Sequence, residues 1–151
     1  MTEALTKEEA SLFELLTLEC KVDARGTVRH FNAQGRLHRV YGPAVVYADG
    51  YRAWYQNGQL HRLAGPAIEW ADGSCDWYQN GRLHRLDGPA IEYPDGHREW
   101  LQQGRWHRLD GPAIEYPDGR RAWHINGKEL TETEWQQTVA SMGLFGRTRT
   151  I

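Results

Sequence analysis

A 23-residue unit, copied in tandem, determines what this chain can fold into. The copy that shows it most fully runs from Trp77 to Glu99 and reads WYQNGRLHRLDGPAIEYPDGHRE. A histidine, a glycine and an aromatic position each recur with this period: His38, His61, His84 and His107; Gly35, Gly58, Gly81, Gly104 and Gly127; Phe31, Trp54, Trp77, Trp100 and Trp123. Such a period is typical of repeat proteins, in which one unit cannot bury its own apolar face and stacking buries it.

Residues 31–130 hold four and a half of these units, and the segments on either side predict caps. In residues 1–30, Thr6 and Glu9 form a capping-box pattern, and apolar residues follow at spacings of three and four. This pattern predicts a helix over about residues 7–18 and then a lead-in strand. The helix would cover the first sheet edge, since bare edges invite aggregation; a helix that docks in a partner's groove is the alternative.

Residues 131–151 repeat the capping signal at the other end. Thr131 and Glu134 form a second capping box, and an amphipathic pattern follows as far as Gly143. We expect a short second capping helix and then a tail, residues 145–151, that holds two arginines and no acid.

Each unit carries two turn signals, most of them Asx-Gly pairs such as Asp72-Gly73 and Asn80-Gly81, which favour type I′ turns with two-residue loops. The pairs divide a unit into three short strands, so the fold class is mainly β: an elongated antiparallel β-hairpin repeat array with a short capping helix at each end. About nine to eleven strands are expected, in a single open or shallowly coiled sheet. The predicted register places Tyr93 opposite Arg98, Glu92 opposite Glu99 and Trp100 opposite His107, and brings Glu99 next to Arg108. One face would then carry isoleucine, tryptophan and tyrosine together and be the most buried.

Composition excludes several classes of protein. The chain has 151 residues, 40% of them apolar, and no apolar stretch long enough to span a bilayer, nor a signal-peptide pattern at its start. A cytoplasmic protein is the expectation. Cys20 and Cys75 are the only cysteines, too few for a disulfide framework or a thiolate zinc site, and we expect no metal or cofactor. The formal charge of -2 provides no overall attraction to nucleic acid.

The segment from Tyr78 to His84, YQNGRLH, resembles the core of the MORN repeat, W-x-N-G-x-x-H. Residues 31–135 are more similar still to the MORN-variant repeats of bacterial, phage and large-virus proteins, which read W-Y-x-N-G-x-L-H-R-x-D-G-P-A. The resemblance implies hairpin arrays that act as interaction scaffolds, some of them at lipids or in dimers, some labelled antitoxins, and none with catalytic residues. Here Arg85 and Arg108 replace the glycine after the histidine, which argues against membrane or phosphoinositide binding.

A histidine and an arginine followed by an aspartate form the one set in which an enzyme could be sought: His84, Arg85 and Asp87, or His107, Arg108 and Asp110. Acid-base catalysis needs a pair made unequal by its surroundings, usually once per site. Here the histidine and arginine occur in four copies, and a structural role explains that better. We therefore expect a protein that is not an enzyme, and the His-Arg-Asp set stays the enzymatic alternative.

The repeated tryptophan, tyrosine and arginine also allow a second alternative, a platform that stacks bases or small ligands. Acidic residues recur as often as the arginines, however, and such a surface repels phosphate as much as it attracts it.

The leading hypothesis is a non-enzymatic module that binds another protein, in the form of an inhibitor or immunity-type protein that acts on a toxin, nuclease or defence component. Repetition creates length and rigidity and no single pocket. An uncovered sheet edge or aromatic face also allows two chains to form a homodimer. Residues that vary between units are the candidate partner-binding residues: Tyr41, Tyr51, Ala64, Ser74, Asp87, His97, Trp106, Asp110 and Arg120.

Overall fold

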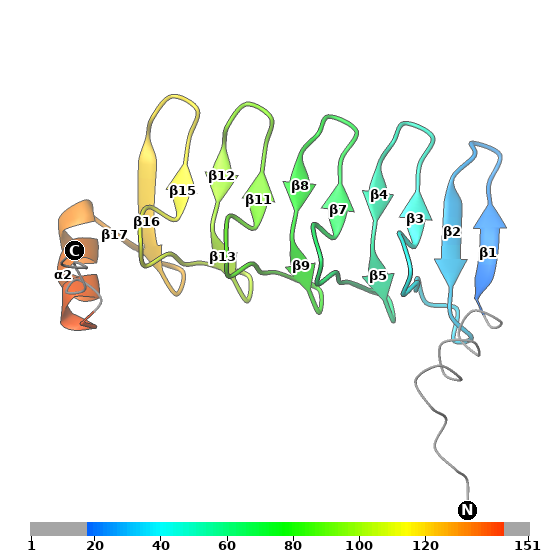
Figure 1. The fold of residues 1–151 in the computed structure, drawn as a ribbon, viewed down its shortest axis with the longest axis horizontal. Coiled ribbons are helices and arrows are strands. Elements are labelled where there is room, and N and C mark those ends of the chain that lie inside the picture. Colours follow the sequence, from blue (N-terminus) through cyan, green and yellow to red (C-terminus); the bar gives the residue numbers. More distant parts are fainter. Residues whose placement is uncertain (1–17, 144–151) are drawn as a thin grey trace, which may run out of the picture.

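The computed structural model describes residues 18–143, and these form one long antiparallel sheet with a helix at its C-terminal end (Figure 1). The sheet contains eleven strands in the order β1-β2-β3-β4-β7-β8-β11-β12-β15-β16-β17. Their bounds are β1 Glu19–Val22, β2 Val28–Phe31, β3 Val45–Val46, β4 Arg52–Ala53, β7 Ile68–Glu69, β8 Cys75–Asp76, β11 Ile91–Glu92, β12 Arg98–Glu99, β15 Ile114–Glu115, β16 Arg121–Ile125 and β17 Lys128–Leu130. The predicted elongated hairpin array with a C-terminal helix is confirmed, whereas the predicted N-terminal helix lies outside the described residues.

Each of the three middle units adds a short second hairpin at the lower edge of the sheet in Figure 1. These hairpins pair β5 Tyr55–Gln56 with β6 Gln59–Leu60, β9 Tyr78–Gln79 with β10 Arg82–Leu83, and β13 Leu101–Gln102 with β14 Arg105–Trp106. Their loops have two residues, and both have positive φ, as at Asn57 (52°) and Gly58 (84°). The type I′ turns are therefore as predicted, and Trp100 lies opposite His107, whose N–H donates to the Trp100 carbonyl at 3.0 Å.

The hairpin at each Asp-Gly pair differs from the prediction. The N–H of Tyr93 donates to the carbonyl of His97 at 3.0 Å, so three residues form the loop, and only the glycine, Gly96, has a positive φ (94°). The Asp95 carboxylate accepts from the His97 N–H at 2.9 Å, which stabilises this longer turn.

That extra residue makes the predicted register wrong by one position. Glu92 lies opposite Arg98, and Ile91 lies opposite Glu99. The predicted contact between two glutamates is replaced by a pair of opposite charge. Since side chains alternate along a strand, isoleucine and tryptophan, predicted to share a face, lie on opposite faces.

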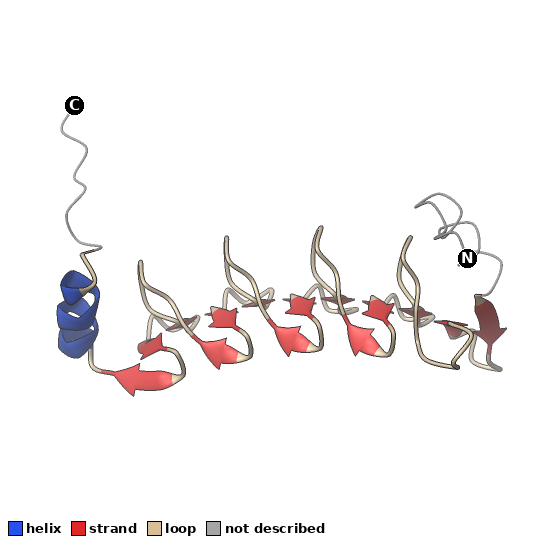
Figure 2. Cartoon of the chain, turned by 90° about the horizontal axis from the view of Figure 1, so that it is seen from below, coloured by secondary structure: helices blue, strands red, loops and turns tan. Residues whose placement is uncertain are grey.

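The loops that join one unit to the next project from one side of the sheet, the side that also carries helix α2 (Figure 2). These loops are residues 38–44, 61–67, 84–90 and 107–113, and each ends in an alanine that is fully buried: Ala44, Ala67, Ala90 and Ala113. No other described segment covers the opposite side of the sheet in this view. The protein is thus a single layer, in which each unit buries its apolar side chains against the next.

Helix α2, Glu132–Ser141, caps the C-terminal end as expected. The Thr131 N–H donates to the Glu134 carboxylate at 2.8 Å, and the Glu134 N–H donates to the Thr131 hydroxyl at 3.3 Å, which completes the capping box. Trp135 packs on Trp123 with ring centroids 4.6 Å apart, and its indole N–H donates to the Arg108 carbonyl at 2.9 Å. In the part of the chain described here, no helix is long and apolar enough to cross a membrane.

Candidate interaction surfaces

The sheet has two sides with different chemistry, because successive residues of a strand point in opposite directions. We call the side that carries the four projecting loops and Trp54, Trp77, Trp100 and Trp123 the loop side. The other side carries isoleucines in its centre and aromatic residues beside the Asp-Gly turns, and we call it the aromatic face. Its aromatic residues are Tyr47, Tyr51, Trp70, Tyr93, His97 and Tyr116.

On the loop side, one arginine holds each loop in place. The Arg85 guanidinium stacks on Trp77, 4.1 Å from the ring centroid, and donates to the Pro89 carbonyl at 3.1 Å and to Glu92 at 3.0 Å. Arg62 and Arg108 repeat all three contacts in their own units. Arg108 therefore pairs with Glu115, and the predicted pairing with Glu99 is wrong.

The glycine of each loop leaves room for this arginine. A Cβ atom added at Gly88 would lie 2.8 Å from the Arg85 guanidinium carbon, closer than carbon atoms can approach. Arginine, glutamate, proline and glycine thus recur because the loop needs them to close, and these residues carry a structural role.

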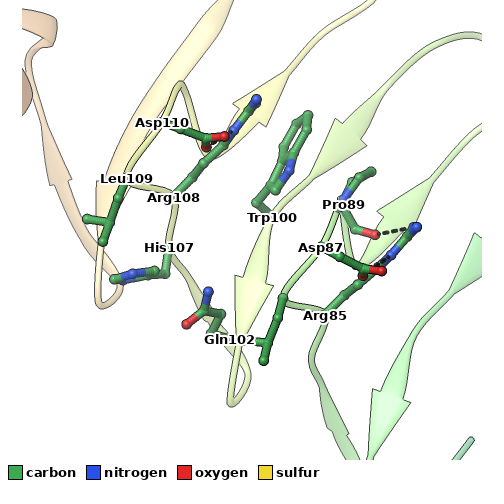
Figure 3. Close-up of a pocket in the computed structure, with 11 residues that line it drawn as sticks. Arg85, Asp87, Pro89, Trp100, Gln102, His107, Arg108, Leu109 and Asp110 are labelled. Carbon is green, nitrogen blue, oxygen red and sulfur yellow. Dashed lines mark hydrogen bonds and ion pairs between the residues drawn. The ribbon is translucent and has the colours of Figure 1, made fainter. Parts of the chain in front are cut away.

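The histidine of each loop connects one unit to the next. His84 Nδ1 accepts the N–H of Gln103 at 3.1 Å, and His38, His61 and His107 accept the corresponding N–H in the same way. Meanwhile Arg108 forms an ion pair with Asp110 at 2.8 Å, and Figure 3 shows the His107 ring turned away from that pair. The histidine, arginine and aspartate of a loop therefore do not converge on one point.

Grooves separate neighbouring loops. The groove between loops 84–90 and 107–113 has a volume of about 470 Å³ and is floored by Trp100 and Gln102 (Figure 3). The groove between the first two loops has about 410 Å³ and is floored by Trp54 and Gln56. Both are open and shallow, which suits contact with a large surface better than enclosure of a small molecule.

The aromatic face carries ring contacts along the row of Asp-Gly turns. Tyr51 packs between Tyr47 and Trp70, with centroids 4.8 Å and 5.1 Å away. Farther along the array, His97 packs between Tyr93 and Tyr116 at 5.3 Å and 5.1 Å. Burial raises the pKa of Tyr51 to about 12, so the phenol stays neutral and the row is uncharged there. Trp70 and Tyr93 are each 45% exposed and form an accessible rim.

Two carboxylates lie in the centre of the aromatic face, at a position where other units have alanine. Ala53, Asp76, Glu99 and Ala122 occupy the same position of successive units, each 23 residues after the one before. Asp76 accepts the Trp70 indole N–H at 3.0 Å, and Glu99 accepts the Trp106 indole N–H at 2.7 Å and faces His97 Nε2 at 2.9 Å. Burial raises the pKa of the Asp76 carboxyl above its usual range, against the opposing effect of the Trp70 hydrogen bond.

These two residues were not among the sequence candidates, although the departure from alanine was visible in the repeat. The wrong register at the Asp-Gly turn concealed them, because it placed Glu99 next to Arg108 on an ionic face.

The nine sequence candidates divide between the two sides. Tyr41, Ala64, Asp87 and Asp110 are exposed on the loops of the loop side. Tyr51, His97 and Arg120 belong to the row beside the Asp-Gly turns, and Trp106 reaches the aromatic face through Glu99. Ser74 is only 2% exposed and offers no contact surface.

Comparison with known protein families and with curated proteins finds no match for this chain. Over residues 18–143, no three histidine, cysteine or acidic side chains lie close enough together to hold a metal ion.

Proposed function

We propose that this protein is a non-enzymatic module that binds another protein along its aromatic face. The observation that carries the proposal is the row of partly exposed rings beside the Asp-Gly turns: Trp70 and Tyr93 are each 45% exposed, whereas Ile68 and Ile114 in the centre of the face are buried. Exposed aromatic rings of this kind are typical of protein interfaces, where tyrosine and tryptophan are enriched. On the loop side, by contrast, Trp54, Trp77 and Trp100 are covered by Arg62, Arg85 and Arg108 of the protein itself.

The resemblance to MORN-variant repeats supports the same proposal, and from it comes the narrower one that the partner is a toxin, nuclease or defence component that this protein inhibits. Binding of nucleic acid is less well supported. Asp76 and Glu99 lie in the middle of the aromatic face, and each would repel a phosphate placed on the rings.

The test is affinity capture with the tagged protein from extracts of its source cells, followed by calorimetry with the purified partner. We expect one saturable protein partner, with affinity reduced at least tenfold by Trp70→Ala or Trp106→Ala. Leu86→Ala is the matched control, because Leu86 is 74% exposed at a loop on the other side. Retention of nucleic acid alone, or equal loss of affinity with the Leu86 variant, would contradict the proposal.

A further inference from the structure

The two carboxylates in the centre of the aromatic face are the strongest departure from the repeat. The position is filled by Ala53 in β4 and Ala122 in β16, and alanine there satisfies the sheet without any polar group. Asp76 in β8 and Glu99 in β12 instead place carboxylates at a partly buried position, and at Asp76 burial disfavours the charged form. The fold does not require these charges, so a role in recognition explains them better.

The surroundings of Asp76 have the composition of a cation site. Asp76 lies opposite Ile68 on one side and Ile91 on the other, and Tyr78, the first residue of β9, follows it two positions later. Trp70 and Tyr93 lie two residues beyond those isoleucines, on the same face and toward the turns. A carboxylate with aromatic rings around it suits a guanidinium group, which forms an ion pair with the acid and stacks on the rings.

In the described part of the chain, no lysine or arginine neutralises these acids, and His97, 2.9 Å from Glu99, would do so only when protonated. Arg29 and Arg120, at opposite ends of the face, are already paired with Asp23 at 2.8 Å and with Asp118 at 2.6 Å. Within residues 18–143, no lysine or arginine forms an ion pair with Asp76 or Glu99, and their hydrogen bonds come from indole and imidazole nitrogens. On the loop side, the three acids Glu69, Glu92 and Glu115 each have a guanidinium partner. The centre of the aromatic face is therefore complementary to positive charge.

The spacing of the two acids restricts the shape of the ligand. Strand β11 alone separates β8 from β12, so Asp76 and Glu99 are two strand spacings, or about 9.6 Å, apart. In a polyproline-II helix every third residue lies on the same face, about 9.3 Å farther along. Polyproline-II segments also dock on surfaces lined with aromatic rings.

We propose that the aromatic face binds a polyproline-II segment of the protein partner through two arginines three residues apart, one at Asp76 and one at Glu99. This inference rests on the proposed function, since it names the chemistry of the partner at the same surface.

The probe is the peptide acetyl-Arg-Pro-Pro-Arg-amide, titrated into the full chain at low salt while the Trp70 and Trp106 indole N–H signals are followed by NMR. The control peptide replaces both arginines with citrulline, which has the same shape without the charge. We expect the arginine peptide to bind at least tenfold more tightly and to shift both indole signals. Equal binding of the two peptides would overturn the proposal. A third peptide, acetyl-Arg-Pro-Arg-amide, tests the spacing: it should bind severalfold more weakly, and equal affinity would overturn the assignment of one arginine to each acid.

Two variants separate charge from structure. Asp76→Asn retains an acceptor for the Trp70 indole and removes only the charge, and we expect it to lose most of the preference for arginine over citrulline. In the double variant Asp76→Asn with Glu99→Gln the preference should disappear, and a preference that persists would overturn the proposal. Asp76→Ala, which restores the residue of the other units, should give the same loss in a protein that remains folded by circular dichroism.

The outcomes also distinguish this inference from the proposed function. A captured partner that binds the Asp76→Asn variant and the unchanged protein equally would refute the arginine site and leave the protein interface standing. An arginine preference in the peptide titration without any protein partner would support the site and refute the proposed function.

Discussion

The two sides of the sheet differ in whether their acidic side chains have an arginine partner. On the loop side the middle units repeat one arrangement, in which an arginine covers a tryptophan and neutralises a glutamate, as Arg85 does with Trp77 and Glu92. On the aromatic face the isoleucines are copied, but the residues between them change from unit to unit, and in the described part of the chain no lysine or arginine pairs with Asp76 or Glu99. The comparison teaches that side chains which must close each unit are copied, whereas those which vary occupy the surface left open.

The largest effect should come from removing a tryptophan on the loop side. Trp54 is 9% exposed, and the guanidinium carbon of Arg62 lies 3.8 Å from the centroid of its ring. Trp54→Ala should lower the free energy of unfolding by about 3–5 kcal/mol, as for other buried aromatic residues. The matched control is Trp70→Ala on the aromatic face, which should cost only about 1 kcal/mol. Urea denaturation measures both, and equal losses would remove the distinction between the two sides.

The next largest effect should come from filling the space that Gly88 leaves for the Arg85 guanidinium. Gly88→Ala places a methyl group against the Arg85 guanidinium and should destabilise the protein by about 1–3 kcal/mol. In the background of Arg85→Ala the same substitution should cost clearly less, because the crowded atom is gone. A double-mutant cycle on unfolding free energies measures the difference. Strict additivity would show that the glycine is needed for another reason.

A smaller effect is expected from the histidine that joins two units. His84→Ala removes the acceptor of the Gln103 N–H and should cost about 1 kcal/mol. Amide hydrogen exchange at Gln103 should accelerate relative to the equivalent Asn126, which His107 still holds. Unchanged protection of the Gln103 amide would refute the role of the imidazole in the contact between units.

The smallest effect concerns the stability of the aromatic face at different pH values. Because burial raises the pKa of Asp76 above 3.8, the ionised carboxylate is disfavoured in the folded chain. The charge of Asp76 therefore lowers the free energy of unfolding. This loss is absent below the pKa that Asp76 has in the unfolded chain, and it develops as the pH rises through the pKa of the folded chain. Asp76→Ala should therefore stabilise the protein at pH 7 by less than about 1 kcal/mol, since the site is partly solvated, and give no gain at pH 3. Thermal unfolding at both pH values checks this; a gain that is equal at both would show that charge is not the cause.

The sequence predicted the architecture because its signals are local. Asn57-Gly58 can form a type I′ turn without help from distant residues, and Thr131 with Glu134 can cap a helix alone. Asp95-Gly96 is compatible with both a two-residue and a three-residue loop, and the choice depends on the hydrogen bond from the His97 N–H to the Asp95 side chain. That choice determined which residues share a face, and so the position of Asp76 and Glu99 could not be obtained without the structure.

The histidine contact also gives the array a direction. Each imidazole accepts a hydrogen bond from the unit that follows it in the chain. A single unit therefore offers an acceptor to the next unit and donates an N–H to the histidine of the previous one. A duplicated copy of residues 77–99 would bring both halves of that contact with it and could be inserted without leaving either half unmatched. Evolution or an engineer can therefore change the length of the protein by whole units, and every added unit would extend the recognition surface by about 9.6 Å.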